Sequence, residues 1–251
     1  MSTDALVVNA LQAGYGRVPV VFDVSFSVEP GEMVALVGRN GAGKTTSLMA
    51  AAGLRYGMNG GTVSLGGVDL SKATPDDVVR TGLKLVPEGR RLFREMTVLQ
   101  NLKLGAFTRR HEVRSSIDSE LADIYELFPA LAVARDKVAG ALSGGQQQMV
   151  AIGQAMLSKP KFLILDEPTA GLAPALIDDM YDSFNALVQS GIGILIVDQN
   201  IQRVLDSASR YYVVESGRTA LDGVTDSSAL ERVTRIVLGS DRQRQESLDS
   251  I

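Results

Sequence analysis

Cysteine is absent from this sequence, histidine occurs once, and no long apolar run is present. Without cysteine the chain has neither disulfides nor thiolate metal sites, which fits a reducing compartment. No window approaches the roughly 18 apolar residues of a membrane-spanning helix, and the N-terminus lacks the basic and apolar regions of a signal peptide. The formal net charge of −4 carries no basic excess, so no nucleic acid is expected as a partner. We therefore expect a cytoplasmic protein without a membrane span of its own.

Short apolar runs at regular intervals indicate an α/β fold. The 251 residues suffice for one large domain, which we place at residues 1–240, followed by a polar tail at 241–251. Strand-like runs come first and are followed by continuous apolar runs, which are typical of strands buried on both faces. The expected strands are Ala5–Ala10, Val18–Phe22, Val24–Val28, Met33–Val37, Leu83–Val86, Phe162–Leu165 and Gly193–Val197.

Helical patterns separate several of these runs. Helices are expected at Thr45–Ala52 and Ile177–Gln189. Strands that alternate with helices predict a mostly parallel sheet. From about residue 97 the β-branched runs become few and charges recur at helical spacing, so we expect an inserted helical subdomain at about residues 97–158.

A glycine-rich loop follows the apolar run that ends at Val37. Its glycines let backbone N–H groups approach phosphate oxygens, while Lys44 supplies positive charge and the Thr45 hydroxyl can ligate Mg²⁺. Because the loop lies between a buried strand and a helix, a chance glycine turn is a poor alternative. The expected nucleotide-binding residues are Gly38, Arg39, Asn40, Gly41, Ala42, Gly43, Lys44, Thr45 and Thr46.

Two adjacent carboxylates end the apolar run at Phe162–Leu165. Asp166 is placed to hold Mg²⁺, and Glu167 is the natural general base for an attacking water. Adjacent acids after a strand can also be helix caps or solvated surface groups. The phosphate loop makes the catalytic interpretation the stronger one.

The run Leu142-Ser-Gly-Gly-Gln146 completes a set of motifs that resembles the nucleotide-binding subunits of ABC transporters. The resemblance implies a P-loop NTPase core, an N-terminal antiparallel β subdomain and the inserted helical subdomain. It also implies that two subunits dock head to tail. Each ATP is then bound between one phosphate loop and the partner's signature loop, which is here Ser143, Gly144, Gly145 and Gln146. Glycine N–H groups ahead of a helix that starts near Gln146 suit a phosphate.

A closer resemblance is to the ATPase subunits of branched-chain amino-acid importers. It is carried by Val86-Pro-Glu-Gly-Arg-Arg-Leu-Phe93, Gly171-Leu-Ala-Pro174 and Val197-Asp-Gln-Asn200. This class implies a second, non-identical ATPase subunit, two transmembrane permease subunits and an external solute-binding protein. The chain would then be a peripheral subunit on the cytoplasmic face of the membrane that hydrolyses ATP. Branched-chain amino acids are the default solute, and urea or short amides stay open.

The resemblance also assigns two residues outside the main motifs. Tyr15 matches the aromatic residue that stacks on adenine, and a turn residue packed on the core is the alternative. Phe93 and Met96 begin the helical segment, in a region that receives a short permease helix in this family. Packing within the segment's own core is an equally good interpretation of these two residues.

Three positions depart from the wider family. Glu88 stands where Gln is usual, Ala173 where Asp is usual and Gln199 where His is usual. Glu88 can still ligate Mg²⁺ but adds negative charge, and Ala173 removes a carboxylate that helps the two sites communicate. Gln199, a catalytic residue beside Glu167, can donate to the γ-phosphate but cannot relay a proton. The only histidine, His111, has no metal partner nearby and is expected on the surface.

These departures lead to one hypothesis and leave two alternatives. Hydrolysis would be slower or more dependent on the partner than in a subunit with histidine, and the two composite sites would be unequal. One alternative is a soluble ABC ATPase outside transport, although such proteins usually carry a long coiled coil or two cassettes. The other is a regulatory nucleotide-binding subunit with little hydrolysis, which the intact Lys44, Asp166 and Glu167 disfavour.

Overall fold

The computed structural model describes residues 3–54, 58–109 and 114–237, so His111 and the tail at 241–251 lie outside the described residues. Over these residues ten strands form one sheet in the order β5-β4-β1-β2-β10-β9-β3-β8-β7-β6. The strands are β1 (Leu6–Tyr15), β2 (Val18–Val28), β3 (Met33–Val37), β4 (Met58–Leu65), β5 (Val68–Asp69), β6 (Leu83–Val86), β7 (Phe162–Asp166), β8 (Gly193–Val197), β9 (Arg210–Glu215) and β10 (Arg218–Val224).

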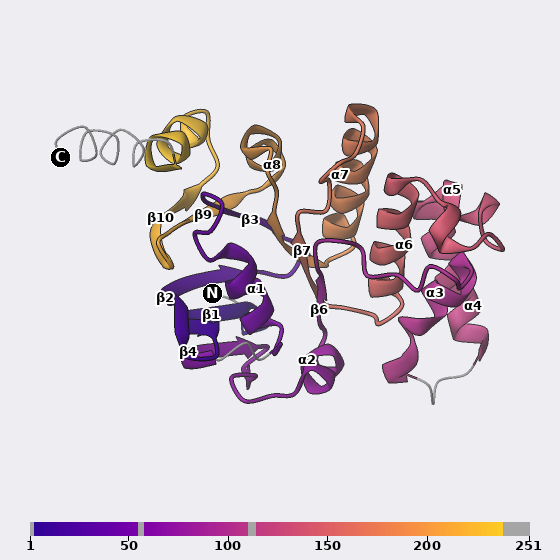
Figure 1. Cartoon of the computed structure of the whole chain (residues 1–251), viewed down its shortest axis with the longest axis horizontal. Coiled ribbons are helices and arrows are strands. Elements are labelled where there is room, and N and C mark those ends of the chain that lie inside the picture. Colours follow the sequence, from indigo (N-terminus) through magenta and orange to yellow (C-terminus); the bar gives the residue numbers. More distant parts are fainter. Residues whose placement is uncertain (1–2, 55–57, 110–113, 238–251) are drawn as a thin grey trace.

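Helices cover the sheet and extend the chain to one side (Figure 1). They are α1 (Lys44–Ala51), α2 (Pro75–Thr81), α3 (Val98–Leu104), α4 (Arg114–Leu127), α5 (Pro129–Val133), α6 (Gly144–Met156), α7 (Pro174–Gln189) and α8 (Ile201–Ser207). Residues 229–237 are also helical. Over the described residues, no helix combines the length and the apolar character needed to cross a membrane.

The centre of the sheet is parallel, as the apolar runs predict. Strand β3 pairs in parallel with β8 and β9, and β7 pairs in parallel with β6 and β8. Every residue of β3, β7 and β8 is buried, because α6, α7 and α8 pack on one face of these strands, while α1 and the antiparallel strands β1, β2 and β4 pack on the other. The carboxyl ends of these strands meet at one edge, where ligands bind in open parallel sheets. That edge collects the residues that follow Val37, Val86, Asp166 and Val197.

The N-terminal part is antiparallel, with β1 between β2 and β4. The prediction of a mostly parallel core with an antiparallel N-terminal part is therefore confirmed, but two strand boundaries were wrong. Strand β1 does not end at Ala10, where a register shift and a left-handed φ of 48° mark a bulge, and it continues to Tyr15. The runs Val18–Phe22 and Val24–Val28 are one strand, because the exposed Asp23 between them pairs with Arg218 of β10.

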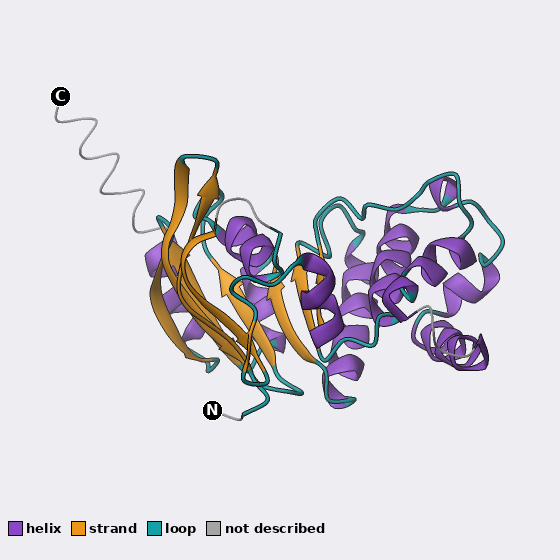
Figure 2. Cartoon of the chain, turned by 90° about the horizontal axis from the view of Figure 1, so that it is seen from below, coloured by secondary structure: helices purple, strands orange, loops and turns teal. Residues whose placement is uncertain are grey.

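Helices α3 to α6 gather at one end, away from β1, β2 and β4 (Figures 1 and 2). Their close packing depends on Gly153 of α6. A Cβ at this position would lie 2.8 Å from Leu102 of α3 and 2.9 Å from Ile124 of α4. Glycine thus lets three helices meet, and α6 then carries the Ser143–Gln146 loop at its N-terminus.

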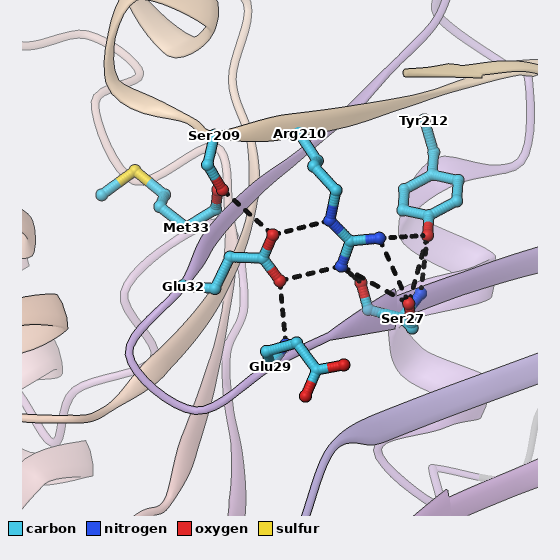
Figure 3. A network of polar contacts seen from close by, with 7 residues as sticks. All are labelled: Ser27, Glu29, Glu32, Met33, Ser209, Arg210 and Tyr212. Carbon is cyan, nitrogen blue, oxygen red and sulfur yellow. Dashed lines mark hydrogen bonds and ion pairs between the residues drawn. The ribbon is translucent and has the colours of Figure 1, made fainter. Parts of the chain in front are cut away.

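A polar network fixes the start of β3 to the start of β9 (Figure 3). The Arg210 guanidinium donates to both oxygens of Glu32, with Nε at 2.6 Å and Nη2 at 2.8 Å. Glu32 also accepts from the Ser209 hydroxyl at 3.0 Å and from the Glu29 N–H at 2.9 Å. Burial would raise the pKa of Glu32, but the hydrogen bonds and the charge of Arg210 hold it below its usual value. Both carboxylate oxygens of Glu32 therefore have hydrogen-bond donors, and the Glu32–Arg210 ion pair, here called the anchor, joins the two strands.

Candidate functional site

The glycine-rich loop connects β3 to α1 and needs its glycines. Gly41 and Gly43 have φ values of 80° and 104°, in the left-handed region that favours glycine. Lys44 begins α1 and folds back, so that Nζ donates to the carbonyl oxygens of Gly38 at 2.8 Å and Arg39 at 2.9 Å. Burial lowers the pKa of Lys44, while the charges of Glu167 and Asp166 oppose that shift. The lysine is thus held inside the loop, beside two carboxylates.

Two adjacent cavities of about 480 and 430 Å³ surround this loop. The structure brings most of the expected site residues to their walls, from β1, the loop, the ends of β6, β7 and β8, and α1. The first cavity is lined by Tyr15, Val20, Asn40, Gly41, Gly43, Lys44, Thr45, Thr46, Glu88, Glu167 and Gln199. The second is lined by Gly38, Arg39, Asn40, Lys44, Glu167, Asp198, Gln199, Ile201 and Val237.

Tyr15 lies at the mouth of the first cavity. Its side chain is 46% exposed, and its hydroxyl is 3.2 Å from the Thr46 hydroxyl. The alternative of a turn residue packed on the core is therefore wrong. An exposed aromatic face at the end of β1 is suited to stacking, and the adenine contact stays a prediction.

Asp166 is the most buried charged group of the site, with 1% of its surface exposed. Burial raises the pKa of its carboxyl group, and the negative charges of Glu167 and Glu88 add to this shift. Its Oδ1 accepts from the Thr45 hydroxyl at 3.3 Å. Among the described residues no donor reaches the buried Oδ2. No helix begins at this point, since α7 starts at Pro174, so the helix-cap alternative is wrong.

An oxygen without a partner beside a hydroxyl fits a hard cation such as Mg²⁺. Thr45 and Asp166 are in contact, and Glu88 lines the first cavity together with Thr45. Within the described part of the chain, no group of three or more His, Asp or Glu residues could hold a metal alone. A cation here would complete its shell with phosphate and water oxygens, as Mg²⁺ does with nucleotides.

Glu167 lies next to Asp166 in a strained conformation. Its φ is 49°, a left-handed value, and its N–H donates to the Val197 carbonyl oxygen at 2.8 Å. The Gln199 amide donates to Glu167 Oε2 at 2.5 Å, so the two residues assigned to catalysis are in direct contact. The amide NH₂ of Gln199 can donate two hydrogen bonds. One can orient Glu167 while the other is donated to a phosphate oxygen.

Asp198 has a structural role that the sequence did not reveal. Its buried carboxylate accepts from Thr169 Oγ1 at 2.6 Å and from the Tyr181 hydroxyl at 3.2 Å. Burial and the charge of Asp198 raise the pKa of Tyr181. Asp198 therefore ties the segment after β7 to the segment after β8, which carry Glu167 and Gln199. The sequence offered one signal for this role, an acidic residue directly after a buried strand.

The signature loop is not part of these cavities. None of Ser143, Gly144, Gly145 and Gln146 lines either cavity, although all four residues are described. Helix α6 begins at Gly144, two residues earlier than expected, because Ser143 is its N-cap. The Ser143 hydroxyl accepts from the Gln146 N–H at 3.3 Å, and Gln146 Oε1 accepts from the Ser143 N–H at 3.2 Å.

Three further residues that the sequence analysis singled out lie outside these two cavities. Ala173 is the N-cap of α7 and makes no side-chain capping bond, so the absent Asp would also have been a helix cap. Phe93 is 60% exposed, and packing within the helical core is therefore wrong for this residue. Met96 is half-buried.

Comparison with known proteins identifies the family. Residues 21–170 match the family described as ABC transporter. The chain belongs to the ABC transporter family. As an ABC ATPase it binds and hydrolyses ATP, as the prediction from its motifs stated. Among relatives, the high-affinity branched-chain amino acid transport ATP-binding protein BraG of Pseudomonas aeruginosa is 40% identical over 82% of this chain and 87% of its own length.

Other relatives of this ABC ATPase have different names. The probable branched-chain amino acid transport ATP-binding protein LivF of Archaeoglobus fulgidus is 35% identical, over 86% of this chain and 90% of its own length. The lipopolysaccharide export system ATP-binding protein LptB of Haemophilus influenzae is 34% identical, over 93% and 97%. A solved ATP-binding cassette of an ABC transporter in its ADP conformation has a TM-score of 0.79 at 26% identity, covering 92% and 94% of the two chains.

Proposed function

We propose that this ABC ATPase is the energising subunit of an importer for branched-chain amino acids or a related small polar solute. The observation that carries the proposal is the 40% identity with BraG over 82% of the chain. The similarity to LivF supports the same class. Import is thus an inference from relatives, while ATP hydrolysis follows from the family.

In this proposal the nucleotide enters the two cavities at the carboxyl edge of the sheet. Lys44 exchanges its bonds to two loop carbonyls for bonds to phosphate oxygens, which bear more negative charge. Tyr15 stacks on the adenine at the mouth. Thr45, Asp166 and Glu88 would hold Mg²⁺, which would offset the charge of the phosphates.

Glu167 is the proposed general base, and Gln199 is the proposed residue that orients it. The 2.5 Å hydrogen bond fixes one carboxylate oxygen of Glu167, so the other can take the proton of an attacking water. Because an amide does not titrate, Gln199 adds no histidine-like step to the pH profile. The rate of ATP hydrolysis at this site would then depend on how well the partner ATPase subunit positions the γ-phosphate.

The proposed partners follow from the position of the signature loop, which lies outside this chain's own nucleotide cavities. The signature residues Ser143–Gln146 do not line them, which supports their action on ATP held by a second, non-identical ATPase subunit. Two permease subunits and an external solute-binding protein would complete the transporter. The exposed Phe93 is suited to the permease contact. The chain would then lie on the cytoplasmic face of the membrane.

The rate of ATP hydrolysis and the retention of bound ATP test the catalytic part of the proposal. In the assembled transporter, Glu167→Gln is expected to lower the ATPase rate by about 10²- to 10⁴-fold while ATP stays bound. Gln199→His is expected to raise the rate and to introduce a pH dependence near neutrality. Full turnover in Glu167→Gln would place the base elsewhere, and an unchanged rate and pH profile in Gln199→His would refute the role of Gln199.

The direction of transport needs its own experiment, because LptB is a relative named for export. Proteoliposomes with inward-facing or outward-facing ATP sites would be given labelled leucine, isoleucine or valine and the solute-binding protein. ATP-dependent movement of the label toward the compartment that holds this chain supports import. Competition by urea or a short amide would redefine the solute, and no movement of any of them would contradict the import proposal.

A further inference from the structure

A large cavity lies between α7 and the corner where α4 meets α5, and we call it the α7 groove. Its volume is about 890 Å³, and its walls come from α4, α5, α6 and α7. Figure 1 shows α5, α6 and α7 in neighbouring positions. The groove shares no lining residue with the two nucleotide cavities, and neither the Ser143–Gln146 loop nor Phe93 or Met96 lines it. The α7 groove is therefore a separate feature of the surface.

The floor of the α7 groove is apolar. Phe128 and Met149 line it and are almost fully buried, with 2% and 8% of their surfaces exposed. Leu127, Ala130 and Leu176 line it as well and are half-buried. The floor thus offers apolar contacts from α6, from α7 and from the corner between α4 and α5.

The shape of the α7 groove favours a helix as its occupant. Its lining residues follow α7 from Leu176 to Ser190, which corresponds to about 20 Å of helix. The walls are helices, whose backbone groups already pair within each helix, so the groove presents no strand edge to an extended peptide. An apolar groove between helices receives the apolar face of another helix.

The rim of the α7 groove is acidic. Asp123, Glu126, Asp179 and Asp182 line it, and all four residues are exposed. Among the described residues no lysine or arginine lines the groove, and none of these four carboxylates has an ion-pair partner. Charges of one sign around a groove attract the opposite charge, so the occupant of this groove is basic.

The same charge disfavours three other occupants. Anionic lipid surfaces and nucleic acids would be repelled by the acidic rim. A second copy of this chain would bring a net charge of −4, and with the same face it would place these carboxylates against their counterparts. A basic helix of another protein remains.

We propose that the α7 groove is a docking site for a basic amphipathic helix of a partner protein. The apolar side chains of that helix lie on the floor, and its lysines or arginines pair with the four carboxylates of the rim. The bound helix bridges α7 and the corner between α4 and α5. The inference goes beyond the proposed function, because it requires neither nucleotide nor transport.

A labelled model helix tests the proposal on the full chain. The probe is a fluorescein-labelled peptide of about 18 residues, with leucines at i, i+3, i+4 and i+7 and lysines on both flanks. Fluorescence anisotropy should show binding of this peptide, and no binding when glutamates replace its lysines. Joint neutralisation by Asp123→Asn, Glu126→Gln, Asp179→Asn and Asp182→Asn should raise Kd about tenfold. Ala186→Arg, an exposed change in the groove wall, should do the same.

Two residues of α4 provide a matched pair of single variants. Asp118 and Asp123 are both exposed, and only Asp123 lines the groove. Asp123→Asn should raise Kd about threefold, and Asp118→Asn should leave it unchanged. Thermal unfolding establishes that each variant is folded.

The absence of cysteine allows the bound peptide to be located. Ala186→Cys places a single thiol in the groove, and Ala220→Cys places one on the exposed face of β10. At a peptide concentration about ten times Kd, alkylation of the first thiol by a maleimide should slow about tenfold, because only free protein reacts. Alkylation of the second thiol should be unchanged.

Several results would overturn the inference. They are no binding of the lysine peptide to wild type, equal binding of the glutamate peptide, an unchanged Kd in the fourfold variant, and equal protection of the two thiols. Binding to vesicles of phosphatidylserine, or a dimer in solution, that Ala186→Arg abolishes would assign the groove to lipid or to a second copy instead. Each of these results would leave the proposed function intact.

Discussion

Two groups of charged side chains lie at opposite ends of the parallel strands, Glu32 directly before β3 and Asp166 at the end of β7, and their partners differ. At the start of the strand, Glu32 is 14% exposed and accepts from four donors. At the other end, Asp166 is 1% exposed, yet among described residues only the Thr45 hydroxyl donates to it. The more deeply buried carboxylate therefore has the fewer partners.

The contrast separates a structural ion pair, the anchor, from the proposed nucleotide site. A buried charge without partners lowers stability, so it is kept where it has a chemical use. The pKa shifts agree, since that of Glu32 is lowered by its partners and that of Asp166 is raised by burial and by neighbouring carboxylates. The Glu32–Arg210 pair stabilises the fold, and the Asp166 carboxylate is suited to the cation of the proposed nucleotide site.

Removal of the anchor should have the largest effect on stability. Arg210→Ala leaves Glu32 half-buried without its main partner, and we expect the free energy of unfolding to fall by about 2–3 kcal/mol. Urea unfolding measures this, with Arg235→Ala as the control, because that arginine pairs with Glu231 on an exposed helix face. If Arg210→Ala lowered the free energy of unfolding by less than Arg235→Ala, the distinction between the anchor and a surface ion pair would be refuted.

The nucleotide side also leaves a helix end unsatisfied. Helix α6 has the Ser143 cap, whereas α7 begins after Ala173 without a side-chain cap. Ala173→Asp should supply the missing acceptor and raise the free energy of unfolding by about 1 kcal/mol. Thermal unfolding of the nucleotide-free chain checks this, with Ala173→Leu as a variant that cannot cap. Equal unfolding temperatures for the two variants would contradict it.

The pH dependence of the stability that the Glu32–Arg210 pair contributes should be the smallest of these effects. Because the pKa of Glu32 is lowered in the folded state, its contribution is present above 4.5, the ordinary value, and is lost as the pH falls through the folded pKa. Glu32→Gln should therefore be less stable than wild type at pH 7, and the difference should narrow below pH 4.5. Urea titrations from pH 7 to pH 3 test this, and a constant difference would refute it.

The sequence predicted the parts of the site whose local pattern is sufficient. Strands β6 and β8 and the phosphate loop were placed correctly, since continuous apolar runs and glycines act locally. The ends of β1 and β2 were not, because a bulge at Ala10 and the pairing of Asp23 depend on neighbouring strands. Strands β4, β5, β9 and β10 were not identified.

Side-chain networks were the least predictable part. Glu32 and Arg210 are separated by 178 residues, and Asp198 and Thr169 by 29. No local pattern marks such pairs, since only the folded sheet brings their strands together. The contact between Gln199 and Glu167 likewise follows from the parallel pairing of β7 with β8.

The most direct test of the central claim is the thermal unfolding of wild type and Asp166→Asn, each with and without Mg-ATP. We expect Asp166→Asn to unfold at a higher temperature than wild type without nucleotide, because a buried, repelled charge has been removed. Mg-ATP should also raise the unfolding temperature of wild type more than that of the variant. A less stable nucleotide-free variant that gains as much from Mg-ATP as wild type would refute the assignment of Asp166 to the nucleotide site.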